Sequence, residues 1–467
     1  MAEEKIDLQG LKGEVEALYG KHLLARITFK GITPWWGGDY EGRTSRWVDE
    51  DEIAGRLRWF LRTVYNRFCA NNLDNYNESE RWISQVLGST SGRSRYSFKV
   101  RDVKYRENSE YGKVLERVRL VTRGKDKDYY PIDMDQFTLE VLRFDENSKF
   151  DELVVSGLLI TLAFLGVGKG VTRGFGRFIP EGCGAISSNL CEYVRRGRVK
   201  EAFESFYSLF RRITGCNKEN SWMESAVPLA PLTEDGPDSI KETHCTANDV
   251  ITVLNVIQRS VMKSTFKTIS YHVEIKDPGP FIHTWVFGLP RHSKVPKDVN
   301  QEKMKVDLDG VQIDEKEVKG SPFMGYLELS KDQQGKNHLV EPRRQSMFVI
   351  SPVWDGTKYK IYIIPFLSLK DNEDKVKVLV HKGIHTGTNK NARNIDRNKI
   401  HLVLISDVLN EKLNGKLLYS DEQSIANSRR DLSYGSVRDI IKNYGNELMK
   451  VIEEVCKGTY GKPKRGR

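Results

Sequence analysis

Residues 152–165 (ELVVSGLLITLAFL) carry very few polar side chains, so a helix built from them would be apolar on nearly every side. Such a helix is stable only when it is buried, for example against a sheet. The stretch is shorter than the roughly 18 uninterrupted apolar residues that a membrane helix needs, and no other window reaches that length. The segment therefore predicts a globular domain with a layered core.

The elements around this helix predict the topology of the first 180 residues. Alternating apolar positions predict strands at 22–32, 96–104, 136–144 and near 175–180. A helix is expected to begin near Asp51, because its apolar residues recur with helical spacing at Ile53, Leu57, Phe60, Leu61, Val64 and Phe68. The resulting order is strand, helix, strand, strand, helix, strand. This is the ferredoxin-like βαββαβ order of RNA-recognition domains.

The remainder of the chain is harder to assign. A long helix at 191–213 and another near 247–266 predict a helical insert, and the polar stretches 294–320 and 370–398 predict loops. Strands are expected at 281–288, 346–353 and 358–366, with a helix at 436–455. We therefore expect an α+β protein with two ferredoxin-like (RRM-like) domains plus helical and charged-loop insertions. The predicted boundaries are 1–190, 191–275 and 276–467, the last ending in a basic tail.

Charge and cysteine content narrow the class of protein. The chain of 467 residues has 74 Lys and Arg against 64 Asp and Glu, a net charge of +10 that favours a polyanionic partner. Six scattered cysteines predict neither a disulfide framework nor, without any CxxC pair, a zinc ribbon. With an acidic N-terminus that lacks an apolar signal region, the expectation is a protein of the reducing cytoplasm with no membrane partner.

The most informative motif is the glycine-rich segment 166–177 (GVGKGVTRGFGR), which we call the glycine loop. It has five glycines in its first eleven residues, three cations (Lys169, Arg173 and Arg177) and no acid. Glycines allow backbone amides to line a concave anion site, and the cations add charge for phosphates. A GxxxxGK[ST] nucleotide loop is excluded because Gly170 follows the lysine. The alternative is a flexible turn with no ligand.

Aromatic and basic residues on the first helix and just before it form a second candidate site. Trp35 precedes the helix, and Arg56, Arg58 and Trp59 lie on it. Rings that stack on bases beside guanidinium groups that pair with phosphates are typical of single-stranded RNA recognition. Core packing of the tryptophans and solvation of the arginines is the alternative.

Further basic segments extend this pattern. Residues 88–106 are rich in Arg and Lys, including Arg93 and Arg95 in the loop before a predicted strand. In the second half, Arg291 and the pair Arg343 and Arg344 are candidate RNA contacts near strand ends. Ordinary solvated surface is the alternative for all of them.

Catalytic patterns are poor. Two histidines at 381 and 385 have helical spacing but sit among glycines, which argues against a metal pair. Asp39 is a lone acid without a partner. The sequence therefore predicts no catalytic residues, no metal and no cofactor.

Several of these segments together resemble the RAMP proteins of type III-B CRISPR (Cmr) effector complexes, and most closely their first subunit. The segments are 32–34 (ITP) with the following Gly37 and Gly38, 53–60 (IAGRLRWF), 87–90 (LGST), the glycine loop, 287–291 (FGLPR) and 343–346 (RRQS). Charged insertions around 216–245 and 294–340 depart from the family pattern.

The resemblance implies a non-catalytic RNA-binding subunit with two ferredoxin-like domains. Its partners would be guide RNA (crRNA), single-stranded target RNA and other Cmr subunits, with contacts to the guide 3′ region and the target at one end of the antiviral complex. Two alternatives remain open. One is a RAMP-type endoribonuclease that processes guide RNA or cleaves target RNA through Asp39 or a histidine such as His283. The other is a protein-interaction subunit that binds no RNA by itself.

Overall fold

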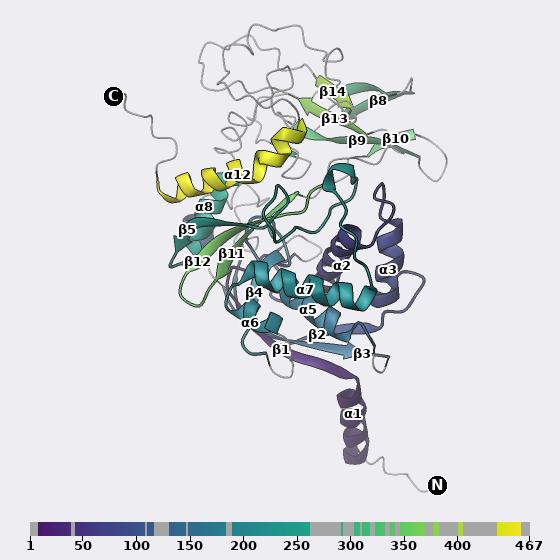
Figure 1. The fold of residues 1–467 in the computed structure, drawn as a ribbon, viewed down its shortest axis with the longest axis vertical. Coiled ribbons are helices and arrows are strands. Elements are labelled where there is room, and N and C mark those ends of the chain that lie inside the picture. Colours follow the sequence, from purple (N-terminus) through teal and green to yellow (C-terminus); the bar gives the residue numbers. More distant parts are fainter. Residues whose placement is uncertain are drawn as a thin grey trace.

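A computed structural model describes most of the first 261 residues and parts of the remainder. The described ranges are 8–38, 43–107, 110–115, 130–145, 148–183, 189–261, 291–292, 303–308, 311–317, 323–331, 337–340, 346–368, 377–382, 400–404 and 437–458. The fold is a mixed α+β architecture built on antiparallel sheets (Figure 1).

The first sheet has the strand order β2-β3-β1-β4, and all its pairings are antiparallel. Helices follow β1 and β3, so the predicted order of strands and helices over the first 180 residues is confirmed. The elements are β1 (Leu23–Gly31), α2 (Glu50–Phe68), α3 (Asn77–Leu87), β2 (Tyr96–Arg106), α4 (Tyr111–Val114), β3 (Asp133–Arg143), α5 (Asp151–Ile160), η3 (Thr161–Leu165) and β4 (Phe178–Pro180).

Helix α2 forms where the sequence provides a cap, an acidic first turn and one apolar stripe. The side chain of Asp49 accepts a hydrogen bond from the Asp51 amide, which satisfies one of the free donors at the helix start. Glu50, Asp51 and Glu52 in the first turn complement the helix dipole. The apolar stripe predicted from spacing, which includes Ile53 and Leu57, is fully buried.

The apolar segment 152–165 is buried as predicted, and the reason is a second helix on its outer side. Every residue from Leu153 to Ile160 in α5 is buried, and the chain continues as the π-helical turn η3. Helix α7 (Val199–Thr214) packs over α5, and its Phe206 ring lies 5.1 Å from the ring of Phe60 on α2. Helix α6 (Asn189–Arg195) contacts both α5 and α7.

The second sheet has the order β11-β12-β5, and its strands β11 and β12 are buried on both faces. It consists of β11 (Phe348–Trp354), β12 (Tyr359–Pro365) and β5 (Lys241–Ala247). Alternate residues such as Val349 and Ile364 join the core of the first half, while Ile350 and Ile363 join a second core. That second core is completed by α8 (Val250–Val261) and α12 (Val437–Cys456). Burial on two faces explains why β11 and β12 are almost continuously apolar.

The predicted helical insert at 191–275 is not a separate unit. Helices α6 and α7 belong to the core of the first half, whereas β5 pairs with β12 in the second sheet. The predicted single helix at 191–213 is divided at Gly197, which adopts φ of 65° between α6 and α7.

The segment that follows α7, expected to be a charged insertion, packs along α2 instead. It contains the short 3-10 helix η4 (Trp222–Glu224). The buried guanidinium of Arg67 donates to the carbonyl oxygens of Asn220 and Ala230 and pairs with Asp238 at 2.7 Å. This interior ion pair fixes the segment to the first half.

All six cysteines form disulfides, so the prediction of a chain without disulfides is wrong. Cys69 pairs with Cys216 and Cys183 with Cys191. Cys245 on β5 pairs with Cys456 at the end of α12, 211 residues away. The Cys69–Cys216 and Cys245–Cys456 pairings join residues far apart in the sequence, so they depend on tertiary structure and no local spacing predicts them.

The region expected to be polar loops contains strands. A third sheet has the order β10-β9-β13-β14, with β6 also paired to β9, and β7 pairs with β8. These are β6 (Arg291–His292), β7 (Lys303–Leu308), β8 (Val311–Glu317), β9 (Phe323–Lys331), β10 (Asn337–Val340), β13 (Lys377–Lys382) and β14 (Ile400–Leu404). The strand predicted at 281–288 lies outside the described residues.

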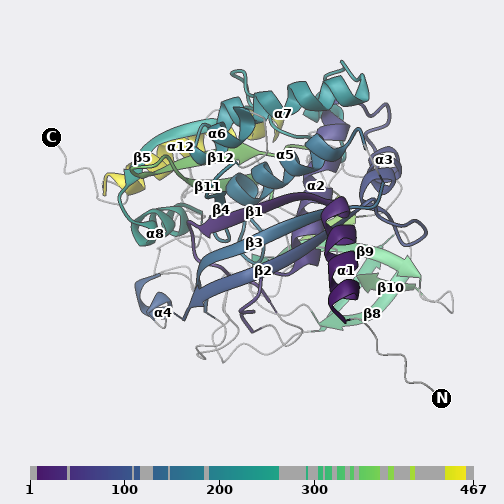
Figure 2. The same cartoon turned by 90° about the horizontal axis from the view of Figure 1, so that it is seen from below.

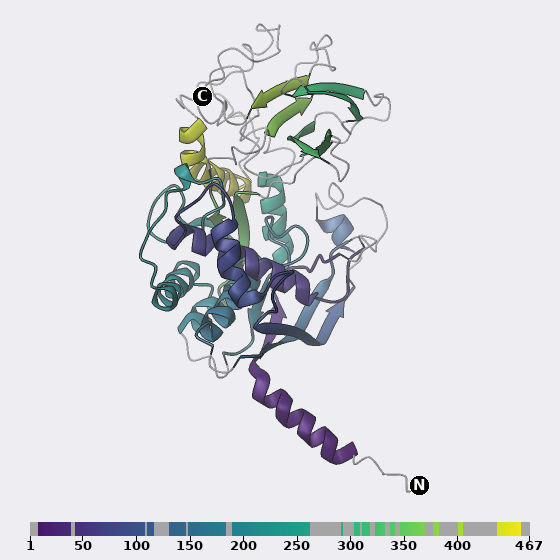
Figure 3. The same ribbon diagram turned by 90° about the vertical axis from the view of Figure 1, so that its right-hand side faces the viewer.

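At the end of the molecule opposite the third sheet, helix α1 (Leu8–His22) projects away from the body (Figure 3). Among the described helices, none is long and apolar enough to span a membrane.

Candidate nucleic-acid interface

The glycine loop connects η3 to β4, and its backbone takes a shape that only glycine tolerates. All five of its glycines have positive φ, from 65° at Gly176 to 94° at Gly174. A Cβ atom at Gly176 would lie 2.0 Å from the carbonyl oxygen of Val167, which is sterically impossible without rebuilding the loop. The glycines are therefore required by a tight, specific conformation, and the interpretation as a merely flexible turn does not account for them.

The loop lies between the two sheets. On one side, the amide of Gly176 donates to the carbonyl of Pro34 at 3.0 Å, just after β1. On the other side, the amide of Ile350 on β11 donates to the carbonyl of Thr172 at 3.1 Å. The loop thereby joins the first half to the second, and its exposed atoms lie at their junction.

Arg177 is the internal anchor of the loop. Its side chain is fully buried and donates to the carbonyls of Val171 and Phe175 and to Ser351 Oγ on β11. Burial lowers the pKa of this guanidinium well below its ordinary value, and the nearby charge of Arg56 lowers it further. This is a correction to the prediction from sequence: Arg177 closes the loop from inside, and its guanidinium is buried and not presented on the surface.

Arg56 and Arg173 are the cations that remain available. The Arg56 guanidinium lies 4.1 Å from the centroid of the Trp59 ring and donates to the carbonyl of Leu165 at 3.3 Å. Its Nε is buried with no hydrogen-bond partner among the described residues. Burial lowers the pKa of Arg56 to about 9 and also lowers the pKa of Arg173.

No carboxylate in the described part of the chain forms an ion pair with Arg56, Arg173 or Arg177. Burying charged guanidinium groups without counter-ions is costly, which the lowered pKa values express. An anion bound at this place would remove much of that cost. The arrangement is therefore suited to a phosphate or another oxyanion.

Lys169, the third predicted cation, lies at the mouth of the loop. It is partly exposed, and its side chain lies next to Gly38 in the segment after β1. The positive charge of Lys169 acts to lower the pKa of the Glu52 carboxyl group in the first turn of α2. Burial, aided by the charge of Asp49, nevertheless raises the pKa of Glu52 to about 7. Sequence reasoning missed Glu52, because it is an ordinary first-turn acid until the fold places it beside the loop.

Both tryptophans chosen from the sequence are core residues. Trp35 is fully buried, and its indole Nε1 donates to the carbonyl of Ser45 at 2.8 Å. Trp59 is 9% exposed, and its ring lies 4.6 Å from the ring of Phe366. This corrects the expectation that Trp35 and Trp59 stack on bases. Their role in this structure is to pack the junction beneath the loop.

Arg58 lies on a different side of α2 from Arg56, as expected for helical residues two positions apart. It donates to the carbonyls of Leu87 and Gly88 at 2.8 and 2.7 Å and pairs with Glu80 at 3.2 Å. These bonds hold the LGST segment against α2. The structure therefore gives Arg58 a structural role and does not bring it together with Arg56.

Arg93 and Arg95 follow the LGST segment. Arg93 is exposed, with its guanidinium 4.7 Å from the centroid of the Phe144 ring. Arg95 is held by the carbonyl of Gln85 and by an ion pair with Asp145 at 2.6 Å. Arg93 is thus the freer of the two for a ligand.

Of the candidates in the second half, one lies in a described strand. Arg291 lies in β6 opposite Met324 of β9, as a backbone pairing. Arg343 and Arg344, together with Asp39 and His283 of the nuclease alternative, lie outside the described residues. The described residues contain no cluster of three or more His, Cys, Asp or Glu side chains that could hold a metal ion.

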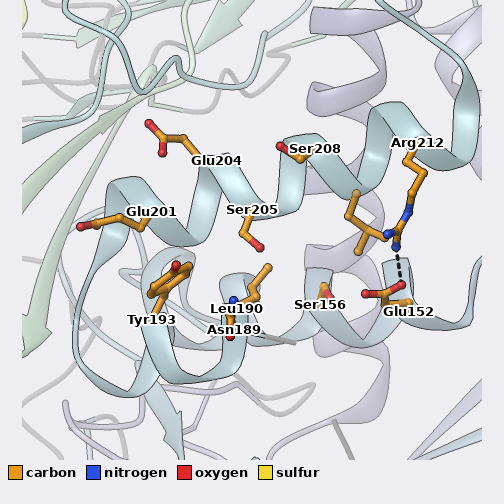
Figure 4. A pocket seen from close by; sticks show the side chains of 11 residues that line it. Glu152, Ser156, Asn189, Leu190, Tyr193, Glu201, Glu204, Ser205, Ser208 and Arg212 are labelled. Carbon is orange, nitrogen blue, oxygen red and sulfur yellow. Dashed lines mark hydrogen bonds and ion pairs between the residues drawn. The ribbon is translucent and has the colours of Figure 1, made fainter. Parts of the chain in front are cut away.

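A groove of about 500 Å³ lies elsewhere, between α5, α6 and α7 (Figure 4). Serines and glutamates line most of it, and Arg212 pairs with Glu152 at 2.7 Å along one side. None of the cations predicted to bind RNA lines this groove. It is therefore separate from the glycine loop.

Comparison with known proteins supports a family assignment for the first half. The family model of RAMPs, the RAMP superfamily, matches residues 28–179. No curated protein matches the chain. Solved structures similar to the chain include a type III-B Cmr-beta complex bound to cognate target RNA, at 14% identity over 74% of this chain and 94% of that chain with a TM-score of 0.46. They also include apo Cmr1 from Pyrococcus furiosus, at 15% identity over 83% and 96% with a TM-score of 0.42.

The matched segment contains the LGST segment, the glycine loop and most of the first sheet. The resemblance to RAMP proteins inferred from these motifs is confirmed, because residues 28–179 match the RAMP superfamily model.

Proposed function

We propose that this protein is a non-catalytic RNA-binding subunit of a type III-B CRISPR (Cmr) ribonucleoprotein and acts in the cytoplasm. In this role it contacts the 3′ region of the guide RNA and the target RNA at one end of the complex, beside other Cmr subunits. The RAMP match and the sequence motifs support the family context. The geometry of the glycine loop supports the choice of ligand.

We also propose that both halves are ferredoxin-like domains. The first sheet has the order β2-β3-β1-β4 with helices after its first and third strands, as that topology requires. In the second half, β5, α8, β11, β12 and α12 occur in this order along the chain, with strands β6 to β10 inserted between α8 and β11 and strands β13 and β14 between β12 and α12. The sheet order is β11-β12-β5. These are the first five elements of the same unit in the same arrangement.

The observation that carries the RNA proposal is the pair of partly buried arginines at the loop, which have no counter-ion among the described residues. Arg56 and Arg173 form no ion pair with a carboxylate in the part of the chain that the structure describes, and the loop opens at the junction of the two halves. A phosphate of an RNA strand supplies the missing negative charge, and Lys169 at the mouth adds attraction for the neighbouring phosphate. Because Trp35 and Trp59 are buried, we expect affinity to come mainly from the phosphates, with little base selectivity at this loop.

Fluorescence anisotropy of labelled single-stranded RNA tests this proposal. We expect Arg173→Gln to weaken binding at least about tenfold at low salt, since one charge-assisted contact contributes about 1.5–3 kcal/mol. Arg195→Gln is the matched control, because Arg195 is an exposed arginine on α6 that pairs with Glu192. Equal binding by wild type and Arg173→Gln, with both proteins folded, would remove the loop from the RNA site.

One specific observation supports the endoribonuclease alternative, and it is the raised pKa of Glu52. A carboxyl group with a pKa of about 7 beside Lys169 and the loop has the properties of a general acid or base. Incubating labelled RNA with wild type and with Glu52→Gln separates the two functions. Cleavage by wild type that Glu52→Gln loses would favour the nuclease, whereas intact RNA with retained binding favours the non-catalytic subunit.

A further inference from the structure

The first sheet has a second surface that the glycine loop does not use. Its strands alternate, so that Ile27 and Phe29 point into the core while Arg26, Thr28 and Lys30 point to the opposite face. We call this opposite face of β1, β2 and β3 the open sheet face. Figure 2 shows the three strands side by side.

The register of the strands arranges this face in three rows, because residues directly opposite in antiparallel strands share a face. The rows, read from β2 through β3 to β1, are Lys99-Glu140-Arg26, Arg101-Thr138-Thr28 and Lys104-Gln136-Lys30. Five of these nine positions are cations and one is an acid. All three positions on β2, at the edge of the sheet, are cations.

The single acid of the three rows already forms ion pairs with two arginines of the same face. Glu140 is nearly buried and pairs with Arg26 at 2.7 Å and with Arg101 at 3.6 Å. Burial acts to raise the pKa of the Glu140 carboxyl. This pKa nevertheless lies below its ordinary value, because Tyr19 and Arg26 donate hydrogen bonds to the carboxylate. It therefore stays ionised and orients the two arginines.

The lysines of the face have no such partner. Lys30 and Lys99 are exposed and form no ion pair with any described residue, and Lys104 donates only to the amide oxygen of Gln136. Glu181 lies at the β4 edge and accepts a hydrogen bond from Gln136. The face as a whole keeps an excess of positive charge.

We propose that the open sheet face binds the sugar–phosphate backbone of RNA as a second contact surface, in addition to the glycine loop. The proposal rests on the RNA-binding function proposed above. The three rows present cations, hydroxyl groups and an amide, which can all donate to phosphate oxygens, and they present no aromatic or large apolar side chain. A protein interface would be expected to have an apolar or aromatic centre, which this face lacks.

The three rows carry no aromatic side chain, which distinguishes them from the stacking platform of ordinary RNA-recognition domains. The ring that reaches the face from α1, Tyr19, uses its hydroxyl to donate a hydrogen bond to Glu140. Bases would not be stacked here, so recognition would be independent of sequence and dominated by charge. Such binding weakens steeply with salt, with a slope of about 0.7 per phosphate contact for a single strand.

The test compares three full-length proteins in anisotropy titrations with one labelled single-stranded RNA at several salt concentrations. The face variant is Lys30→Gln/Lys99→Gln/Lys104→Gln. The matched control is Arg196→Gln/Lys200→Gln/Lys450→Gln, which removes the same charge from exposed or partly exposed side chains in the turn after α6, on α7 and on α12. The third protein is Arg173→Gln, which changes only the glycine loop.

We expect the face variant to bind at least tenfold more weakly at low salt, with a salt slope reduced by about 2, while the control stays within twofold of wild type. Equal loss in the face variant and the control would mean a general charge effect and would overturn the proposal. An unchanged face variant alongside a weakened Arg173→Gln would overturn it while leaving the loop site intact. Polyglutamate that competes as well as unlabelled RNA would show instead that the face receives an acidic protein.

Discussion

Arg177 Nε donates to Ser351 Oγ at 3.0 Å, so the last residue of the glycine loop is bonded to the central part of β11, 174 residues further along the chain. The same guanidinium also holds two carbonyls of its own loop. The loop is therefore fixed by the contact between the two halves of the molecule. Its shape depends on both sheets being folded.

We expect Arg177→Gln to destabilise the protein by about 2–4 kcal/mol, because it removes buried charge-assisted hydrogen bonds and leaves carbonyl oxygens without donors. Ser351→Ala removes only one of these bonds and is expected to cost about 1 kcal/mol. Urea unfolding followed by tryptophan fluorescence measures both. Similar small losses for the two variants would show that Arg177 does not hold the loop.

The three disulfides predict a protein whose stability depends on oxidation. The Cys245–Cys456 bond closes a loop of 211 residues, and in the chain-entropy view such a bond contributes about 5 kcal/mol, against about 2.5 kcal/mol for the short Cys183–Cys191 loop. We expect the Cys245→Ser/Cys456→Ser variant to melt at a clearly lower temperature than Cys183→Ser/Cys191→Ser.

Intact mass spectrometry under non-reducing conditions is the control for the disulfide experiment. The oxidised protein should be lighter than the fully reduced chain by six hydrogen atoms. Free thiols on all six cysteines, with a melting temperature that a reductant leaves unchanged, would contradict the pairing. Stable structural disulfides inside cells are typical of proteins from hyperthermophiles.

Glu52 predicts a pH dependence of stability. Its pKa is about 7 in the folded chain, above the ordinary value of 4.5, so the folded state holds the proton more tightly than the unfolded state. The resulting stabilisation is fully present below about pH 4.5 and is lost as the pH rises through 7. Allowing for its partial exposure, we expect a loss of about 1–2 kcal/mol.

Glu52→Gln should remove that part of the pH dependence. Unfolding free energies at pH 5 and pH 8 would then differ less for the variant than for wild type by about 1–2 kcal/mol. An identical difference in both proteins would mean that Glu52 ionises in the fold as it does in water. Glu204→Gln, at an exposed site on α7, is a suitable comparison.

The buried pair of Arg67 and Asp238 predicts the cost of detaching the segment after α7. Asp238→Ala leaves the Arg67 charge buried without its partner, which should destabilise the fold by about 3–5 kcal/mol. The exposed pair of Arg196 and Glu192 is the comparison, and Arg196→Ala should cost less than about 0.5 kcal/mol. Thermal or urea unfolding that ranks the two variants equally would contradict this.

The topology of the first half could be predicted because it depends on local patterns. The apolar stripe of α2 and the alternation in β1 reflect which face is buried, and both patterns are visible along the chain. The glycine loop was also predictable, since a run of glycines beside cations has few structural uses. Helix α12 and strands β11 and β12 follow from the same reasoning.

The fate of individual cations and aromatic rings could not be predicted in this way. Arg177 and Arg173 have the same chemistry and lie four residues apart, yet only the fold decides that the first is interior and the second is available. Trp35 was chosen as a base-stacking residue because nothing local shows that Phe178 and Ser45 enclose it. The second sheet was missed in part because β5 pairs with a strand more than a hundred residues away.

The central claim is that RNA lies against the glycine loop. The most direct measurement is photo-crosslinking of 4-thiouridine-labelled single-stranded RNA to the full-length protein, with the attached peptides identified by mass spectrometry. Our account predicts crosslinks to the peptide that contains Lys169 and Arg173, and their loss when Arg56 and Arg173 are both changed to Gln. Crosslinks that occur only elsewhere, and that the double variant leaves unchanged, would contradict it.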